Sequence, residues 1–514
     1  MGRAKEESSD RSITRGADFL QLHIGDAPAG GLSSWLARQL RLAIEDGRLP
    51  VGGRLPATRV LAGELGVSRG VVTEAYRRLT EDGHVAGHGR GGTVVVAAPV
   101  TVPAPARPPG TQRKPGPPGP PGPPAASATL EPSAASALFG PAPGANVFDA
   151  LRAAPARIDL SPGLPDLAAF PRTAWLRAER SVFGQLSPAG FGYGDPRGTP
   201  ALRQAVASWL ARNRGIRVDP EEICIVAGVA QALSLLAQVL LADGIRAVGV
   251  EDPGSLGTRQ QLHNWRLDTP PVTVDPGGLR VDELRASGAR AVLLTPAHQF
   301  PTGVVLDGGR RRELMRWARD GGLVIEDDYD AEHRYDRPPV PALRSMLAEH
   351  VCYAGSVSKL LAPALRVGWV LAPPRYRDAL VAAKRHADLG NAVLPQLVLA
   401  RLMESGEMER QLRFVRRRHR RRRDAMIVAI RTHLPGAVVH GAAAGLHLMI
   451  TFEAGFADAD LAAAALARGV KVQPLSWHGQ RPQRPGIVLG YAANTTADIE
   501  EGVATLGRAL RGLR

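Results

Sequence analysis

The residues best suited to chemistry in this sequence lie in the segment Ser356-Val357-Ser358-Lys359, with Arg366 seven residues after the lysine. A lysine amine can form an imine with an aldehyde, and hydroxyl groups together with a guanidinium can bind a phosphate. Pyridoxal phosphate carries both an aldehyde and a phosphate. The segment therefore predicts a pyridoxal phosphate site in which Lys359 forms the imine and the other polar side chains face the phosphate.

Two other segments carry groups that complement this site. Gly228-Val229-Ala230-Gln231 follows an apolar run and predicts a strand-to-helix turn, where free N–H groups at a helix N-terminus bind an anion. The segment 324–329 places acids and a phenol at the end of another apolar run. An acid there can keep a pyridine nitrogen protonated, and the phenol can hydrogen-bond the ring hydroxyl.

Each of these pieces has a plainer explanation when taken alone. A single lysine is usually surface charge, and acids after a strand usually cap a loop or a helix. Their combination and order favour a cofactor site. The apolar runs that precede them alternate with helix-like segments, as in a mostly parallel sheet flanked by helices. The apolar runs that predict the strands are 223–226, 247–250, 291–294, 323–325, 351–354 and 367–371.

A second candidate site lies near the start of the sequence. A short helix is predicted over 57–65, Gly66 breaks it, and a helix over 71–79 follows. In the second helix apolar residues form one arc, whereas Arg69, Thr73 and Arg77 recur at every fourth residue on another. Turn and strand signals alternate over 83–96, which predicts a two-stranded wing with Arg90 near its tip. A basic arc can face a DNA major groove, and the alternative is a small dimerisation or protein-binding domain.

Residues 31–98 resemble the DNA-binding domain of the GntR family. The resemblance rests on Gly53-Arg54-Leu55-Pro56-Ala57-Thr58-Arg59, Leu65-Gly66-Val67-Ser68-Arg69 and Ala75-Tyr76. It implies a winged helix-turn-helix of the α+β class that binds double-stranded operator DNA. The DNA-contacting positions implied are Arg59, Ser68, Arg69, Thr73, His88 and Arg90.

Residues 155–514 resemble fold-type I aminotransferases, and the joined architecture resembles the MocR subfamily of GntR regulators. The motifs are Phe191-Gly192-Tyr193-Gly194-Asp195-Pro196-Arg197-Gly198, the segment 295–303 and the lysine segment. The resemblance implies an α/β domain with a mostly parallel sheet and a small C-terminal α/β subdomain. It assigns Lys359 to the internal aldimine, Asp327 to the pyridine nitrogen and Tyr329 to the ring hydroxyl. The implied phosphate cup consists of Ser356, Ser358, Arg366, Gly228, Val229 and Ala230.

Three positions depart from the aminotransferase pattern. Phe300 stands where an asparagine usually touches the ring oxygen, so that His298 or Gln299 is the candidate for that contact. Ser255 stands where the family often has an aromatic residue that stacks on the ring. Val488 stands where an arginine usually holds the substrate carboxylate in a bidentate pair. Either another arginine, such as Arg259, replaces it, or the ligand is not an ordinary amino acid.

Composition is consistent with this division of the chain. The 514 residues carry a formal net charge of +15, which favours nucleic acid or another polyanion as a partner. Two cysteines and no long apolar stretch predict a cytoplasmic protein without disulfides or membrane spans. We predict a flexible segment over 1–30, a winged helix over 31–98, a Pro/Gly/Ala-rich linker over 99–154 and the large domain over 155–514.

The sequence leaves two functions open. One is a regulator whose large domain binds pyridoxal phosphate, senses a small-molecule effector and forms a head-to-tail homodimer; its effector is pyridoxal phosphate itself or an amino acid. The other is a working aminotransferase with an accessory DNA-binding domain, although the regulator interpretation still allows a residual half-reaction. The arginine-rich run 413–423 is interpreted as a solvated helix face, with a supplementary phosphate-binding surface for DNA as the alternative.

Overall fold

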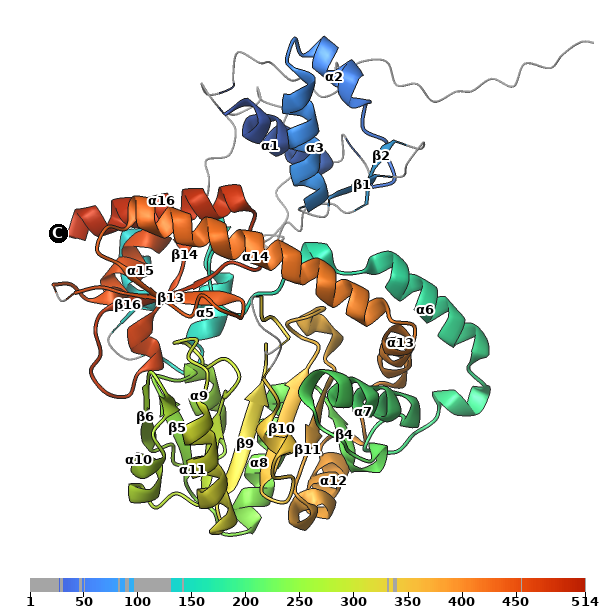
Figure 1. The fold of residues 1–514 in the computed structure, drawn as a ribbon, viewed down its shortest axis with the longest axis vertical. Helices are drawn as coiled ribbons and strands as arrows, with labels where there is room; N and C mark the ends of the chain where they lie inside the picture. The colour runs from blue at the N-terminus through green and yellow to red at the C-terminus, as the bar shows by residue number, and fades with distance from the viewer. Residues whose placement is uncertain are drawn as a thin grey trace, which may run out of the picture. The chain divides into compact units, whose positions relative to one another are not determined.

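The chain divides into two compact units in this computed structural model, residues 1–121 and 122–514 (Figure 1). The described residues are 27, 31–45, 49, 51–81, 84–87, 92–96, 131–140, 143–330, 332–335, 340–453 and 455–513. Among them, no helix is both long and apolar enough to cross a membrane.

The N-terminal unit has the predicted helices and wing. Its elements are α1 (Leu32–Glu45), α2 (Thr58–Glu64), α3 (Arg69–Glu81), β1 (Val85–Gly87) and β2 (Thr93–Val95). Leu40, Leu61, Val72 and Leu79 meet in one buried cluster, so the apolar arc of α3 faces the core as predicted. The two strands pair antiparallel, and the Tyr76 hydroxyl donates to the Pro56 carbonyl at 2.8 Å, which fixes α3 against the start of α2.

An eight-stranded sheet forms the centre of the second unit, in the order β4-β11-β10-β9-β8-β5-β6-β7. Pairing is parallel from β10 through β6 and antiparallel at β11 and β7. All six predicted strands are present. The apolar runs did not predict the two strands at the far edge of the sheet. The strands are β4 (Ile223–Val226), β5 (Val248–Asp252), β6 (Pro271–Asp275), β7 (Gly278–Leu279), β8 (Ala291–Leu294), β9 (Leu323–Asp328), β10 (Val351–Ser356) and β11 (Gly368–Leu371).

Helices cover both faces of this sheet, because most of its strands are apolar on both sides. On one face α8 and α12 pack against Val226, Ile325 and Val370. Side chains of α7, α11 and α13 pack against the opposite face, for example on Ile225 and Val324. The helices are α6 (Arg172–Gln185), α7 (Pro200–Arg214), α8 (Val229–Ala242), α9 (Leu256–Asn264), α10 (Val281–Ala286), α11 (Gly308–Arg319), α12 (Pro374–Asp388) and α13 (Val393–Glu404).

The predicted small C-terminal subdomain is built on a four-stranded sheet in the order β12-β13-β16-β15. The long helix α14 lies beside α16, and both cover this sheet (Figure 1). A short strand, β3 (Ile158–Asp159), joins the subdomain by pairing with β14. The other elements are α14 (Glu407–His433), β12 (Val438–His440), β13 (His447–Thr451), α15 (Asp458–Leu466), β14 (Val470–Lys471), β15 (Gln473–Pro474), β16 (Gly486–Gly490) and α16 (Thr496–Leu513).

The predicted linker 99–154 contains two helices that belong to the subdomain core. They are α4 (Pro132–Leu138) and α5 (Val147–Ala153). Phe139 stacks on Trp477 with ring centroids 5.1 Å apart, and Ala135, Val147 and Leu151 are buried in the same cluster. Residues from about 132 onward therefore belong to the domain and not to the linker, which corrects the predicted boundary. The Pro/Gly/Ala content could not show this, because small residues also allow helices to pack closely.

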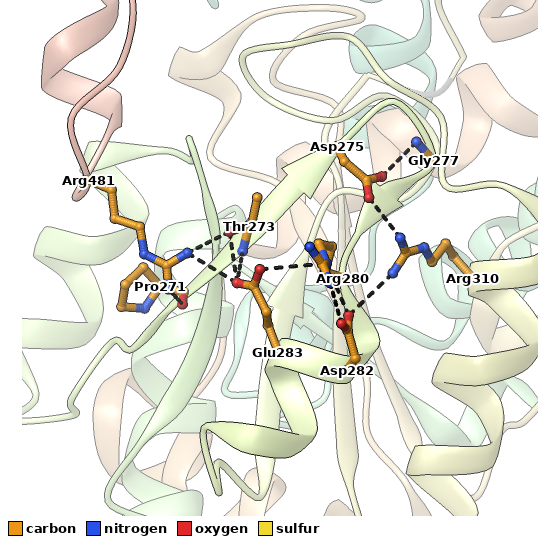
Figure 2. A network of polar contacts seen from close by, with 9 residues as sticks. All are labelled: Pro271, Thr273, Asp275, Gly277, Arg280, Asp282, Glu283, Arg310 and Arg481. Atoms are coloured by element: carbon orange, nitrogen blue, oxygen red, sulfur yellow. Dashed lines mark hydrogen bonds and ion pairs between the residues drawn. The ribbon is translucent and has the colours of Figure 1, made fainter.

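A polar network ties the small subdomain to the edge of the main sheet (Figure 2). Arg481, in the loop before β16, donates to Thr273 Oγ1 at 2.5 Å and to Glu283 Oε2 at 3.1 Å. Its other terminal nitrogen donates to the Pro271 carbonyl at 3.1 Å. These contacts hold the loop against β6 and α10.

Candidate cofactor and DNA sites

A cavity of about 390 Å³ lies where the parallel strands end, between the main sheet and β13. Loops that follow the carboxyl ends of strands are the usual ligand sites of such sheets. The cavity walls contain nearly all the side chains that the sequence predicted, and these come from separate strands. Its lining includes Gly163, Val229, Ala230, Ser255, Thr295, Phe300, Asp327, Tyr329, Ser356, Ser358, Lys359, Arg366, Leu446 and His447.

Lys359 reaches into this cavity from the turn after β10. Its Nζ donates to the Gly163 carbonyl at 2.6 Å. Burial lowers the pKa of the Lys359 amine, while the carboxylates of Asp330 and Asp327 act in the opposite direction. A lowered pKa enriches the neutral amine, which is the form that attacks an aldehyde.

Asp327, the residue before the last of β9, lies on the same wall. Its Oδ1 is buried and has no hydrogen-bond partner among the described residues. Burial, with Asp328 and Asp330 nearby, raises the pKa of Asp327 to about 7. A buried carboxyl oxygen without a partner fits a cationic or N–H donor in the cavity, as a protonated pyridine nitrogen would supply. The cavity thus fits the group that the sequence predicted.

His298 is not on the cavity wall, whereas the sequence made it a candidate for direct contact with the ring oxygen of the cofactor. It is buried behind Tyr329, with its Nδ1 2.9 Å from Asp330 Oδ2 and 3.1 Å from the Tyr329 hydroxyl. The Tyr329 hydroxyl also donates to the His298 carbonyl at 3.2 Å. Burial raises the pKa of Tyr329, and Asp330 adds to this, so the phenol stays protonated. His298 therefore orients Tyr329, and Phe300 occupies the wall in its place.

The anion-binding end is formed by the predicted turn and by Arg366. Gly228 caps α8 with φ of +83°, and a Cβ there would lie 3.4 Å from the guanidinium of Arg366. Arg366 itself has φ of +51° and donates to the Ala227 carbonyl. The first N–H groups of α8 and the hydroxyls of Ser356 and Ser358 complete a cradle for an anion.

The position of the missing carboxylate arginine is filled by apolar side chains. Val488 is fully buried in a cluster with Met449 and Leu475, against which Phe300 packs. The rings of His447 and His478 each lie 4.9 Å from that of Phe300. Burial lowers the pKa of both histidines to about 3, so neither carries a charge near neutral pH. Among the described residues of this wall, none offers a cation to a carboxylate.

Arg259 does not replace the missing arginine. Its guanidinium donates to the carbonyls of Gly254 at 3.0 Å, His478 at 2.8 Å and Trp477 at 2.8 Å. These bonds join α9 to the small subdomain. Ser255, at the N-cap of α9, accepts a hydrogen bond from the Thr258 N–H at 3.2 Å and presents a small side chain to the cavity.

The exposed surface of the N-terminal unit carries four of the predicted DNA-contacting residues. Arg59, Ser68, Arg69 and Thr73 are all exposed, and Arg69 Nε donates to Thr58 Oγ1 at 3.3 Å. Arg77, on the same predicted arc, instead pairs with Glu74 at 2.6 Å. His88 and Arg90 lie outside the described residues.

The arginine-rich run of α14 is not simply a solvated face. Arg418 and Arg422 are buried and donate to Asp166 Oδ2 at 2.7 and 2.8 Å. Arg423 is buried as well and donates to the Ala442 carbonyl at 2.9 Å. Arg413 and Arg417 are exposed. One side of the run therefore anchors the helix, and the other faces outward.

Several groups of the site were missed by the sequence reasoning. The Gly163 carbonyl and the His447 ring come from segments without a recognisable motif, and the buried pair of Glu251 with Thr295 was not predicted although the segment 295–303 is one of the motifs. Thr295 donates to Glu251 Oε2 at 2.8 Å, and burial raises the pKa of Glu251 to about 7. The Ser161-Pro162-Gly163 turn after a short strand was the one local signal available.

Both halves of the chain match known families. Residues 32–95 match the gntR family of bacterial regulatory proteins, and residues 157–506 match aminotransferase class I and II. The probable rhizopine catabolism regulatory protein MocR of Rhizobium meliloti is 30% identical over 484 residues, covering 93% of each chain. The pyridoxine biosynthesis transcriptional regulator PdxR of Corynebacterium glutamicum is 30% identical over 465 residues, covering 89% of this chain and 91% of that one.

Solved structures show the same fold for the larger unit. The α-aminoadipate aminotransferase LysN of Thermus thermophilus, complexed with N-(5'-phosphopyridoxyl)-L-leucine, is 27% identical with a TM-score of 0.65. That match covers 74% of this chain and 97% of the enzyme. Fold and site thus define a helix-turn-helix regulator joined to an aminotransferase-like domain. The chain belongs to the MocR subfamily of the pyridoxal phosphate-dependent GntR transcription regulators.

Proposed function

We propose that this protein binds pyridoxal phosphate in the cavity and that occupancy by pyridoxal phosphate itself regulates its binding to operator DNA. Lys359 would form the imine, Asp327 would face the pyridine nitrogen, and Tyr329 would face the ring hydroxyl. Arg366, the turn 228–230 and the two serines would hold the phosphate. The bound group supplies an aldehyde and an electron-withdrawing ring, and the protein supplies orientation and charge.

The observation that carries the choice of effector is the apolar wall around Val488. Of the described residues that line the cavity, only Lys359 and Arg366 bear a positive charge. Lys359 would hold the aldehyde end of the cofactor, and Arg366 would hold its phosphate. The carboxylate of an amino acid would meet Phe300 and neutral His447 instead. Burying an anion without a paired donor is unfavourable, and a bidentate arginine contact would be missing.

The name of one relative points in the same direction. PdxR is called a regulator of pyridoxine biosynthesis, and it is similar to this chain across both units. A regulator of vitamin B6 supply needs a site that recognises the cofactor and has no substrate to turn over. We therefore propose that transamination, if measurable, is slow.

We also propose that the large unit forms a homodimer through the surface around Tyr193. Tyr193 is 93% exposed, and Leu176, Phe183 and Phe191 are each more than half exposed. The rings of Phe183 and Phe191 lie 5.7 Å apart, so these two side chains form one exposed apolar group. Sedimentation of the full chain tests this, and a monomer at micromolar concentration would contradict it.

The regulatory proposal is tested with DNA selected from a random library by the full-length protein. Purified protein is first stripped of cofactor, and its affinity for the selected fragment is measured by fluorescence anisotropy with and without pyridoxal phosphate. The imine absorption is recorded in the same samples. We expect the cofactor to yield an imine band and a change of DNA affinity together, whereas a protein that never forms the band would refute the cofactor assignment.

A further inference from the structure

A fully buried lysine lies directly behind the anion cradle, outside the cavity. Lys384, near the end of α12, is 0% exposed. Its Nζ donates to both oxygens of Asp388, at 2.7 and 2.5 Å, to Asn391 Oδ1 at 2.6 Å and to Gln231 Oε1 at 3.2 Å. A buried cation persists only when it is paired and hydrogen-bonded, so this cluster of four side chains is a built element of the fold.

Two of the partners of Lys384, Gln231 and Asn391, also hold parts of the cradle. Gln231 lies in the first turn of α8, and its Oε1 accepts from the Ala227 N–H at 2.7 Å. The Ala227 carbonyl in turn accepts from the guanidinium of Arg366. Gln231 Nε2 donates to Asp388 Oδ2 at 2.7 Å, which closes the cluster. The turn that presents N–H groups to an anion is therefore tied to Lys384 on its inner side.

The backbone of Arg366 is held from the same cluster. Asn391 accepts from Lys384 and directs its Nδ2 to the Arg366 carbonyl at 3.5 Å. Arg366 has a left-handed backbone, with φ of +51°, which a residue with a side chain adopts only when its surroundings hold it there. A shift of Asn391 would release this support and let the guanidinium move away from Gly228.

We propose that Lys384 is a positioning residue for the phosphate of the cofactor. It touches neither the cavity nor the phosphate, and it acts by fixing the turn 227–231 and Arg366 in the geometry that binds an anion. The ion pair with Asp388 is neutral overall, so the contribution of Lys384 is geometric and not a long-range attraction. This inference rests on the proposed cofactor site and adds a residue that no motif in the sequence indicates.

The test compares two aldehydes that differ only in the phosphate. Imine formation is titrated with pyridoxal phosphate and with pyridoxal, using wild type, Lys384→Met and Lys471→Met. Lys471 is a matched control because it is only 7% exposed and donates to the Arg152 carbonyl at 3.0 Å in the small subdomain, away from the cavity. Melting temperatures of the three cofactor-free proteins, with and without inorganic phosphate, are measured alongside.

Lys384→Met should weaken pyridoxal phosphate binding by roughly tenfold or more, because charge-assisted bonds that fix the cradle are lost, and should leave pyridoxal affinity within about twofold. Inorganic phosphate should stabilise wild type and Lys471→Met but not Lys384→Met. Should Lys384→Met fail to fold, Asn391→Ala is used, with the same selective loss expected. An equal loss for both aldehydes, or no loss for either, would overturn the inference. A wild type that binds neither aldehyde would overturn the proposed cofactor site as well.

Discussion

The chemistry of the site depends on a few charged groups that share a dry environment. Asp327 and Lys359 line the same cavity, and each perturbs the other's pKa. Burial favours the neutral form of both side chains. A neutral Lys359 amine can attack an aldehyde, and Asp327 can become charged when a cationic ring binds beside it. Tyr329 remains a hydrogen-bond donor because burial and Asp330 raise its pKa.

The lowered pKa of Lys359 has a direct kinetic consequence. The neutral amine is present at lower pH than for an exposed lysine, so the rate of imine formation with pyridoxal should rise with pH and reach half its maximum below about 10.4. Stopped-flow absorbance on cofactor-free protein measures this profile. The Asp327→Asn variant should move the midpoint lower still, because the carboxylate raises the pKa of the amine. A midpoint at or above that of free lysine would contradict this description of the cavity.

Replacing Asp327 also tests its assignment to the ring nitrogen. Asp327→Asn keeps the size of the side chain but removes the negative charge, so the amide cannot hold the pyridine nitrogen protonated. We expect a shifted imine band and weaker cofactor binding, by roughly tenfold if one charge-assisted hydrogen bond is lost. Absorbance titration measures both. Spectra and affinity that match those of wild type would mean that another acid faces the ring.

At the scale of elements, the sequence predicts individual helices and strands, but it does not predict contacts between segments that are far apart in the chain. The apolar runs identified six strands, and Asp327 and Ser356 could be placed at strand ends because apolar residues stop there. The helix 71–79 was predicted from its 3.6-residue period, and the helix 57–65 from the break at Gly66. By contrast, the bond from Lys359 to the Gly163 carbonyl joins segments 196 residues apart, and His447 reaches the cavity from the small subdomain. No local pattern encodes such contacts, since they form only when the subdomains pack.

The DNA-binding face of α3 gives a prediction for a single side chain. Arg69 is exposed at the start of the helix, so Arg69→Ala should reduce affinity for selected DNA by roughly tenfold to a hundredfold, as for one lost base contact. The imine spectrum should not change, because the cofactor cavity lies in the other compact unit. Arg38→Ala, which removes an exposed arginine of α1, serves as the control. Equal binding by Arg69→Ala and wild type would remove Arg69 from the interface.

Two arginines tie the small subdomain to the main sheet, and their surroundings predict unequal effects. Arg259 is partly buried and donates to three backbone carbonyls, so Arg259→Ala should lower the free energy of unfolding by about 1–3 kcal/mol. Arg481 is about half exposed, and Arg481→Ala should cost about 0–1 kcal/mol despite its larger network (Figure 2). Urea denaturation of the two variants measures the difference. A larger loss of stability for Arg481→Ala than for Arg259→Ala would show that the exposed network contributes more to the free energy of unfolding.

At the scale of the whole molecule, the chain joins a DNA-binding unit to a unit with the fold of an enzyme. A ligand can regulate DNA binding only if it binds the DNA-competent and DNA-incompetent arrangements with different free energies. Between distinct sites such coupling is typically about 1–3 kcal/mol. The apolar cluster at Val488 stands where an amino-acid substrate would need an anchor, whereas Lys359, Asp327 and Arg366 still line the cavity. The proposed function therefore assigns this unit the sensing of the cofactor.

The most direct test of this account is the affinity for selected DNA as a function of ligand. Cofactor-free protein, protein loaded with pyridoxal phosphate, and loaded protein with each of a panel of amino acids are titrated with the same fragment while the imine spectrum is followed. We predict that the cofactor alone changes the affinity by roughly 5- to 150-fold and that no amino acid changes it further. If the cofactor leaves the affinity unchanged while one amino acid at micromolar concentration shifts both the affinity and the spectrum, the cofactor is not the effector.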